Sequence, residues 1–171
     1  VDHHVATGLG DSKFGVKLTD VIALYQKAAE LKEIEIEGIS CHIGSLVEST
    51  APYMSEIEVL SVFVNELLDR GIALKHFDIG GGAGVAYKAD EKTLEPSELI
   101  PAVVAQIRSL VKIPDIEILI DPGRAIIAQA GVLLTRVEYL KSGLFERNFC
   151  VVDASMTELV RPAMRSEEHT S

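Results

Sequence analysis

The sequence predicts an α/β fold made of consecutive strand and helix units whose parallel strands share one functional edge. Three short motifs that contain glycine and polar residues each end a segment typical of a buried strand, at 41–45, 78–84 and 121–124. They lie roughly forty residues apart, about the length of one strand, one helix and two connections. Because parallel β/α folds gather their chemistry at the carboxyl ends of the strands, these motifs predict a single shared site.

Strands and helices alternate along the first 130 residues. Short segments rich in β-branched residues predict strands at 34–42, 74–79 and 116–120. Apolar residues at three- and four-residue spacing predict amphipathic helices after Thr19, over 57–68 and over 100–111. Pro52 and Gly71 mark the two ends of the second helix. Since proline is tolerated only in a first turn, Pro101 places the start of the third helix between Ser97 and Ile100.

The pattern changes near residue 131, where two strand-like segments follow without a helix between them, at 132–140 and 148–152. We expect a partial β/α barrel over 1–130, the start of a β-rich C-terminal domain over 131–164, and a non-native tail over 165–171. A complete eight-unit barrel needs about 250 residues, so a chain of 171 residues is expected to be a fragment. A partial barrel also has open sheet edges, and failure to fold stably alone is an open alternative.

Composition and charge disfavour several classes of function. With a net charge of −10, nonspecific binding to nucleic acid or to an anionic membrane is disfavoured. The sequence has no signal peptide and no apolar run of membrane-spanning length, so a cytoplasmic protein is expected. Cys41 and Cys150 are too few for a disulfide framework or a zinc site, and buried free thiols are expected.

The glycine run Gly80, Gly81 and Gly82 follows a predicted strand directly. Residues without a Cβ let the backbone approach a phosphate closely while their N–H groups point toward it. A tight turn between a strand and a helix would use the same residues. The run is not a dinucleotide-binding motif, because it lacks the G-x-G-x-x-G spacing.

His42 ends its predicted strand beside Gly44 and Ser45. There the imidazole could stack on a planar ring, and the Ser45 hydroxyl could bind a phosphate oxygen. A histidine with a purely structural role is the alternative.

Asp121 and Arg124 flank Pro122 and Gly123 in a rigid turn that would hold a carboxylate and a guanidinium beside one pocket. The alternative is a surface ion pair, which contributes little stability. Arg161 lies in an otherwise apolar stretch, where a guanidinium needs a carboxylate or phosphate partner. With the stacking histidine and the glycine run, these residues describe a pocket for a phosphorylated aromatic cofactor, and pyridoxal phosphate fits that description.

A series of longer motifs carries a family resemblance over residues 7–164. It includes Cys-His-Ile-Gly-Ser at 41–45, Phe-Asp-Ile-Gly-Gly-Gly-Ala-Gly-Val at 77–85, Asp-Pro-Gly-Arg at 121–124 and Glu-Leu-Val-Arg-Pro-Ala-Met at 158–164. In this order the motifs resemble the pyridoxal-phosphate-dependent decarboxylases of the alanine-racemase-like fold, most closely the diaminopimelate decarboxylases. The resemblance implies part of a pyridoxal-phosphate-binding TIM (β/α)8 barrel, followed by the first strands of a C-terminal β-domain.

The same resemblance implies roles for individual residues. His42 would stack on the cofactor ring, Asp121 would face the pyridine nitrogen, and Arg124 and Arg161 would hold substrate carboxylates. The implied cofactor-binding set is His42, Ser45, Gly80, Gly81, Gly82, Asp121, Pro122, Gly123 and Arg124. The implied reaction converts meso-2,6-diaminopimelate to L-lysine and carbon dioxide, in a homodimer with shared active sites and without nucleic-acid or membrane partners.

The chain departs from the family pattern in several places. The family usually has glutamate at the position of Asp121 and glycine at the position of Ser155. Its Schiff-base lysine is expected before Val1 and its later cysteine-glutamate-serine motif is missing, so this chain alone is expected to be inactive. Residues 165–171 resemble the translation of a sequencing adapter, and a divergent polar tail is the alternative.

Two other functions stay open. A related decarboxylase of ornithine, arginine or carboxynorspermidine would keep the cofactor motifs and change the substrate contacts, although the Arg161 motif favours diaminopimelate. A noncatalytic relative of the barrel would bind a partner protein or only carry the cofactor, and a missing lysine in the complete gene would favour it.

Overall fold

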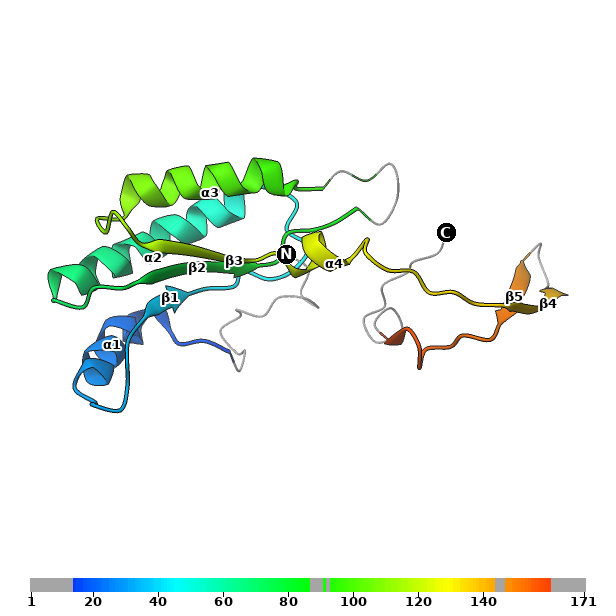
Figure 1. Ribbon diagram of the computed structural model, residues 1–171, viewed down its shortest axis with the longest axis horizontal. Coiled ribbons are helices and arrows are strands. Elements are labelled where there is room, and N and C mark those ends of the chain that lie inside the picture. Colours follow the sequence, from blue (N-terminus) through cyan, green and yellow to red (C-terminus); the bar gives the residue numbers. More distant parts are fainter. Residues whose placement is uncertain (1–13, 87–90, 92, 144–146, 161–171) are drawn as a thin grey trace. The chain divides into compact units, whose positions relative to one another are not determined.

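The computed structural model describes residues 14–86, 91, 93–143 and 147–160, and Figure 1 shows how their helices and strands are arranged. The chain divides into two compact units, Val1–Gln129 and Ala130–Ser171. The candidate site lies in the first unit.

The first unit contains a three-stranded parallel sheet with the order β1-β2-β3. Its strands are β1 (Gly38–Ser40), β2 (His76–Gly81) and β3 (Glu117–Asp121). In the register, Ser40 lies beside Asp78 and Gly81 lies beside Asp121, with an irregularity between Asp78 and Gly81. The three carboxyl ends therefore meet at one edge of the sheet.

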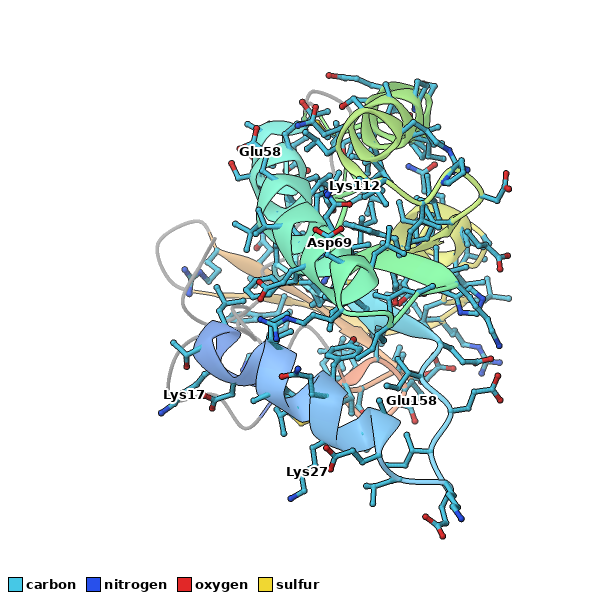
Figure 2. The ribbon with its side chains drawn as sticks, turned by 90° about the vertical axis from the view of Figure 1, so that its left-hand side faces the viewer. Lys17, Lys27, Glu58, Asp69, Lys112 and Glu158 are labelled. Carbon is cyan, nitrogen blue, oxygen red and sulfur yellow. The ribbon has the colours of Figure 1, made fainter. Side chains whose placement is uncertain are left out.

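Helices precede and connect the strands. They are a 3-10 helix (Leu18–Asp20), α1 (Val21–Ala29), α2 (Ala51–Asp69), α3 (Pro96–Leu110) and a short α4 (Gly123–Ile127). Figure 1 shows α2 and α3 side by side over one face of the sheet. Asn65 joins them, because its side-chain amide donates to the Leu110 carbonyl and accepts the Lys112 N–H, both at 2.8 Å. The exposed ion pair of Asp69 with Lys112 lies near this junction (Figure 2).

The core of the first unit lies between the sheet and helices α2 and α3. Successive strand residues point to opposite faces, so Phe77 and Ile79 are fully buried while Asp78 lies on the other face. The largest fully buried side chains are Tyr53, Ile57, Val64, Leu67, Phe77, Ile79, Leu99, Ile107 and Ile116. The face of the sheet turned away from this core is free to carry polar groups.

The second unit contains a two-stranded antiparallel sheet of β4 (Val137–Ser142) and β5 (Asn148–Val152). Every residue of β4 is exposed. Just outside the strands, the Asp153 carboxylate accepts the Arg136 N–H at 2.8 Å and the Thr135 hydroxyl at 2.7 Å, and these bonds lower its pKa. The strands predicted in this region are therefore present, as an antiparallel pair.

Several expected boundaries differ from the structure. The strand predicted at 34–42 shortens to β1, because it pairs on one side only, with a β2 that begins at His76. The strand predicted at 132–140 begins at Val137, where its pairing with β5 begins. Helix α3 begins at Pro96, so Pro101 lies in the second turn and not in the first. The sequence pattern did not indicate α4.

Two further properties concern membranes and cysteines. Among the residues that the structure describes, no helix is both long and apolar enough to cross a membrane. Cys41 and Cys150 are both free thiols, but Cys41 is half-buried and Cys150 is exposed. The expectation that both are buried is therefore wrong, because Cys150 lies in β5 of a two-stranded ribbon in which no strand residue that the structure describes is buried.

Candidate functional site

Backbone hydrogen bonds join the loop after β1 to the end of β2 and to the loop after it. The Cys41 N–H donates to the Asp78 carbonyl at 3.1 Å, and the Val47 N–H donates to the Gly82 carbonyl at 2.9 Å. Val47 and Ala83 also form an isolated parallel bridge. The first two motifs therefore form one continuous backbone surface at the carboxyl edge of the sheet.

The glycine run is required because neighbouring backbone leaves no room for a Cβ. A Cβ on Gly81 would collide with the Asp121 carbonyl oxygen, and a Cβ on Gly82 would collide with the Gly44 carbonyl oxygen. Gly80 and Gly82 also have positive φ angles of 64° and 96°. Close packing of three strand ends therefore accounts for these glycines, and their contact with a phosphate stays a prediction.

His42 lies at the rim of this surface with an exposed side chain. Its Nδ1 accepts the Gly81 N–H at 3.2 Å. Next to it, Asp78 accepts the Gly80 N–H at 2.7 Å through Oδ1 and the Ser40 hydroxyl at 2.8 Å through Oδ2. The Nδ1 edge of the imidazole ring is thus fixed to the end of β2. The side chain is otherwise exposed, so a ligand can reach the ring.

The motif after β3 completes this edge of the sheet. Asp121 ends β3 with an exposed side chain, Pro122 precedes α4, and Gly123 begins it. Within the described ranges, Asp121 and Arg124 form no ion pair, so the alternative of a surface salt bridge is not what the structure contains. The Arg124 Nη1 atom is buried and has no hydrogen-bond partner in the described part of the chain. Such a nitrogen needs an acceptor, and carboxylates and phosphates are its preferred partners.

The remaining predicted residues are less constrained. Ser45 is half-buried and follows the buried Gly44. Leu46, which comes next, has a φ of 59°, a left-handed conformation that is unusual for a leucine and strains this loop. Arg161 lies outside the described residues.

Two polar side chains of α2 support the site from the core side of the sheet. The Tyr53 hydroxyl donates to the Gly81 carbonyl at 2.9 Å, and Tyr53 is fully buried. Burial, with a smaller contribution from Glu56, raises the pKa of Tyr53 to about 12. Glu56 is only 7% exposed, and neither of its carboxyl oxygens has a hydrogen-bond partner among the described residues.

Burial raises the pKa of Glu56 to about 7, with the Asp78 charge adding to the shift and the nearby Cys41 thiol opposing it. Burial, together with Glu56, raises the pKa of Cys41 to about 12. The thiol therefore stays protonated near neutral pH and is a poor nucleophile. Glu56 is the group beneath the site that can change its charge near neutral pH.

The arrangement suits a ligand that combines an anion with a planar ring. Arg124 offers an unpartnered guanidinium nitrogen, and His42 offers an imidazole held in one orientation. Within the described part of the chain, no group of three or more potential metal ligands is found. The residues present therefore fit a phosphorylated aromatic cofactor.

Comparison with known protein families identifies the cofactor class. The sequence model of the family described as "Pyridoxal-dependent decarboxylase, pyridoxal binding domain" matches residues 1–128. The chain belongs to this family. Pyridoxal-dependent decarboxylases use the cofactor that the sequence predicts, and the predicted resemblance is confirmed.

Individual pyridoxal-dependent decarboxylases extend the match. The diaminopimelate decarboxylase of Haemophilus influenzae is 40% identical over 161 residues, which cover 94% of this chain and 38% of that protein. The crystal structure of diaminopimelate decarboxylase from Helicobacter pylori, complexed with L-lysine, matches with a TM-score of 0.87 and 29% identity, covering 99% and 41%. Lysine decarboxylase from Selenomonas ruminantium matches with a TM-score of 0.79 and 26% identity, covering 92% and 40%.

The chain thus spans about two fifths of the length of these decarboxylases. The predicted fold class, part of a pyridoxal-binding β/α barrel followed by the first strands of a β-domain, is confirmed by these matches. The domain boundaries and the roles of single residues stay predictions.

Sequence reasoning did not assign roles to four residues that the structure brings to this candidate site: Ser40, Tyr53, Glu56 and Asp78. Asp78 begins the second motif, and its place at a strand end was a usable signal. Ser40 could be found only from the register that pairs it with Asp78. Tyr53 and Glu56 face the site from α2, and nothing in their helical spacing separates them from ordinary core and surface positions.

Proposed function

We propose that the complete protein is a diaminopimelate decarboxylase, which converts meso-2,6-diaminopimelate to L-lysine and carbon dioxide. The observation that carries the proposal is the 40% identity with the Haemophilus influenzae enzyme across 94% of this chain. The similarity of its fold to the Helicobacter pylori enzyme complexed with L-lysine, the product of this reaction, supports the same substrate.

In this proposal different residues at the carboxyl edge bind different parts of the cofactor and the substrate. Arg124 holds an anion with its unpartnered guanidinium nitrogen, and Ser45 and Gly82 lie at the cofactor phosphate. His42 stacks on the cofactor ring, and Arg161 with Arg124 holds the substrate carboxylates. The bound pyridoxal phosphate supplies an electron sink for the electrons released when carbon dioxide leaves.

Asp121 has a separate role in this proposal. A carboxylate beside the pyridine nitrogen favours the protonated form of that nitrogen, because opposite charges stabilise each other. The Asp121 side chain is exposed at the end of β3, and within the described ranges no ion pair neutralises it. It is therefore free to serve a ligand.

The decisive experiment supplies the purified complete protein and pyridoxal phosphate with meso-diaminopimelate, and measures carbon dioxide and L-lysine. L-lysine, L-ornithine, L-arginine and carboxynorspermidine are offered in parallel at equal concentration. Turnover of diaminopimelate well above the others supports the proposal. Preference for L-lysine would favour the function of the Selenomonas ruminantium relative, and cofactor binding without any turnover would favour a noncatalytic protein.

Asp121→Asn tests the proposed contact with the cofactor. The change removes the charge and keeps the size, so we expect turnover to fall by at least tenfold while the cofactor still binds. Absorbance of the bound cofactor and single-turnover carbon dioxide release measure the two properties separately. Unchanged turnover would remove Asp121 from this role.

We further propose that the complete protein is a cytoplasmic homodimer without nucleic-acid or membrane partners. The net charge of −10 over these 171 residues supports only the absence of anionic partners, because like charges repel. Light scattering of the purified protein measures the mass of the assembly, and a monomer that is fully active would contradict the dimer.

A further inference from the structure

Both oxygens of the Asp78 carboxylate accept a hydrogen bond. Its Oδ1 accepts the Gly80 N–H at 2.7 Å, and its Oδ2 accepts the Ser40 hydroxyl at 2.8 Å. One bond is to its own strand, two residues ahead, and the other is to the neighbouring strand β1. The carboxylate therefore ties the end of β2 to β1 just before the glycine run.

This pair of bonds lies at an irregularity in the last residues of β2. The pairing of β2 with β3 is irregular between Asp78 and Gly81, and Gly80 has a φ of 64°. Asp78 accepts the Gly80 N–H within this irregular stretch. The next N–H, that of Gly81, then points to the β1 side and donates to His42 Nδ1 at 3.2 Å.

The bond to His42 has a chemical consequence. An imidazole nitrogen that accepts an N–H carries no proton, so a neutral His42 must carry its proton on Nε2. A ring turned by 180° would place a carbon opposite the Gly81 N–H and leave a buried backbone donor unpaired. The geometry therefore selects both one face orientation and one tautomer.

We propose that Asp78 is a positioning residue that acts through the Gly80–Gly81 backbone to hold His42 as the Nε2–H tautomer. His42 then presents a hydrogen-bond donor and a fixed ring plane to the ligand at the carboxyl edge. Its relevance to catalysis rests on the proposed function, because that function places the pyridoxal phosphate against His42. The tautomer itself can be measured without cofactor or substrate.

The test uses nitrogen NMR of the complete protein labelled with 15N-histidine, with His42→Gln to assign the signals. In the unchanged protein we expect an unprotonated Nδ1 signal and a protonated Nε2 signal for His42. In Asp78→Ala we expect the two signals to move toward each other as the tautomers mix. A protonated Nδ1 in the unchanged protein, or an unaltered spectrum in Asp78→Ala, overturns the proposal.

A rescue variant separates positioning from general destabilisation. Asp78→Asn keeps an oxygen for the Gly80 N–H, and its amide nitrogen can donate to the Ser40 hydroxyl, so we expect the original spectrum. If Asp78→Asn resembles Asp78→Ala, positioning by these bonds is wrong. Ser40→Ala, which removes one of the two bonds, is expected to give a partial change and replaces Asp78→Ala if that variant does not fold.

Cofactor affinity provides the second readout. Loss of one or two hydrogen bonds behind His42 is expected to weaken pyridoxal phosphate binding by about threefold to tenfold in Asp78→Ala and by less than twofold in Asp78→Asn. Asp115→Ala, an exposed aspartate in the turn before β3, is the matched control and is expected to change neither readout. Equal affinity in all variants overturns the link from Asp78 to the cofactor.

The two proposals fail in different ways. If the unchanged protein shows the expected tautomer and binds the cofactor but does not decarboxylate diaminopimelate, the proposed function fails and the role of Asp78 stands. If the unchanged protein decarboxylates diaminopimelate and Asp78→Ala leaves the His42 signals unaltered, the proposed function stands and the proposed role of Asp78 fails.

Discussion

The two ends of the three-stranded sheet use charged residues in opposite ways. At the amino end, Lys75 pairs with Glu35 at 2.6 Å and with Glu37 at 3.2 Å, and all three side chains are exposed. The bond to Glu35 is the main cause of a raised Lys75 pKa. At the carboxyl end, Glu56 is buried without a hydrogen-bond partner among the described residues. Solvent screens the exposed charges of Lys75 and its two glutamate partners, whereas it cannot screen a charge on the buried Glu56.

The difference implies that the carboxyl end is the sensitive part of the first unit. Exposed ion pairs contribute at most about 1 kcal/mol each, because water and salt compete with them. A buried carboxyl without a partner loses several kcal/mol of hydration when it ionises. Substitutions at the carboxyl end should therefore have large effects, and similar substitutions at the amino end should have small ones.

The largest effect is expected from Gly82→Ala. The new Cβ would collide with the Gly44 carbonyl oxygen, at a residue whose φ is 96°. We expect a loss of stability on the order of 4 kcal/mol, or no folded protein. Urea unfolding of the complete protein, followed by circular dichroism, measures this change.

Gly71→Ala is the matched control, at a glycine that follows the carboxyl end of α2. Gly71 has a φ of 83°, but no atom lies within 4 Å of its Cβ position. Only the backbone strain remains there, so a loss of about 1 kcal/mol is expected. Equal losses for the two variants would show that the strand ends are not closely packed.

The second effect is a pH dependence due to Glu56. Its pKa is about 7 in the folded protein and 4.5 as the ordinary value, so the folded protein binds more protons between these values. Stability therefore falls as pH rises through this window, by on the order of 3 kcal/mol in total. Glu56→Gln cannot ionise, and its stability should lack this part of the fall.

Urea midpoints at pH 5 and pH 8 measure the difference for both proteins. The control is Glu58→Gln on the same helix, whose side chain is exposed and points away from the sheet (Figure 2). It should keep the fall of the unchanged protein. A Glu56→Gln variant with an undiminished fall would mean that Glu56 reaches solvent when it ionises.

The third effect concerns the hydroxyl of Tyr53. Tyr53→Phe removes the bond to the Gly81 carbonyl and leaves that buried oxygen without this donor. A loss of about 1.5 kcal/mol is expected, because unpaired buried polar groups are costly. The exposed Tyr139→Phe in β4 is the control and should change stability by less than about 0.5 kcal/mol. A Tyr53→Phe variant as stable as the unchanged protein would show that water replaces the hydroxyl.

The sequence alone predicted some features of the chain well and others poorly. The sequence predicted that the glycine run, His42 and Asp121 lie together at the strand ends, and the structure places them there, because parallel strands gather polar loops at one edge. Their roles toward a ligand stay predictions. The boundaries of β1 and β4 were not predicted correctly, because the length of a strand depends on the partner strand with which it pairs. Periodicity alone contains no information about that partner.

The supporting residues were harder to find for a physical reason. Glu56 lies among helix residues whose spacing allows either a surface or an interior position, and only the packing of α2 on the sheet decides between them. The Ser40 and Asp78 pair depends on strand register, which a shift of one residue would destroy. Such residues become visible only when the neighbouring element is in place.

The smallest effect is expected at the amino end, from the ion pair of Lys112 with Asp69. Its atoms are 3.2 Å apart, and the side chains are 58% and 64% exposed (Figure 2). Lys112→Met removes the charge and keeps most of the chain length, and its N–H still bonds Asn65. We expect a loss of about 0.5 kcal/mol that disappears in 1 M salt, because screening already removes the ion pair there. A loss as large as that of Tyr53→Phe, unchanged by salt, would mean that the two ends of the sheet do not differ in the way their charges are solvated.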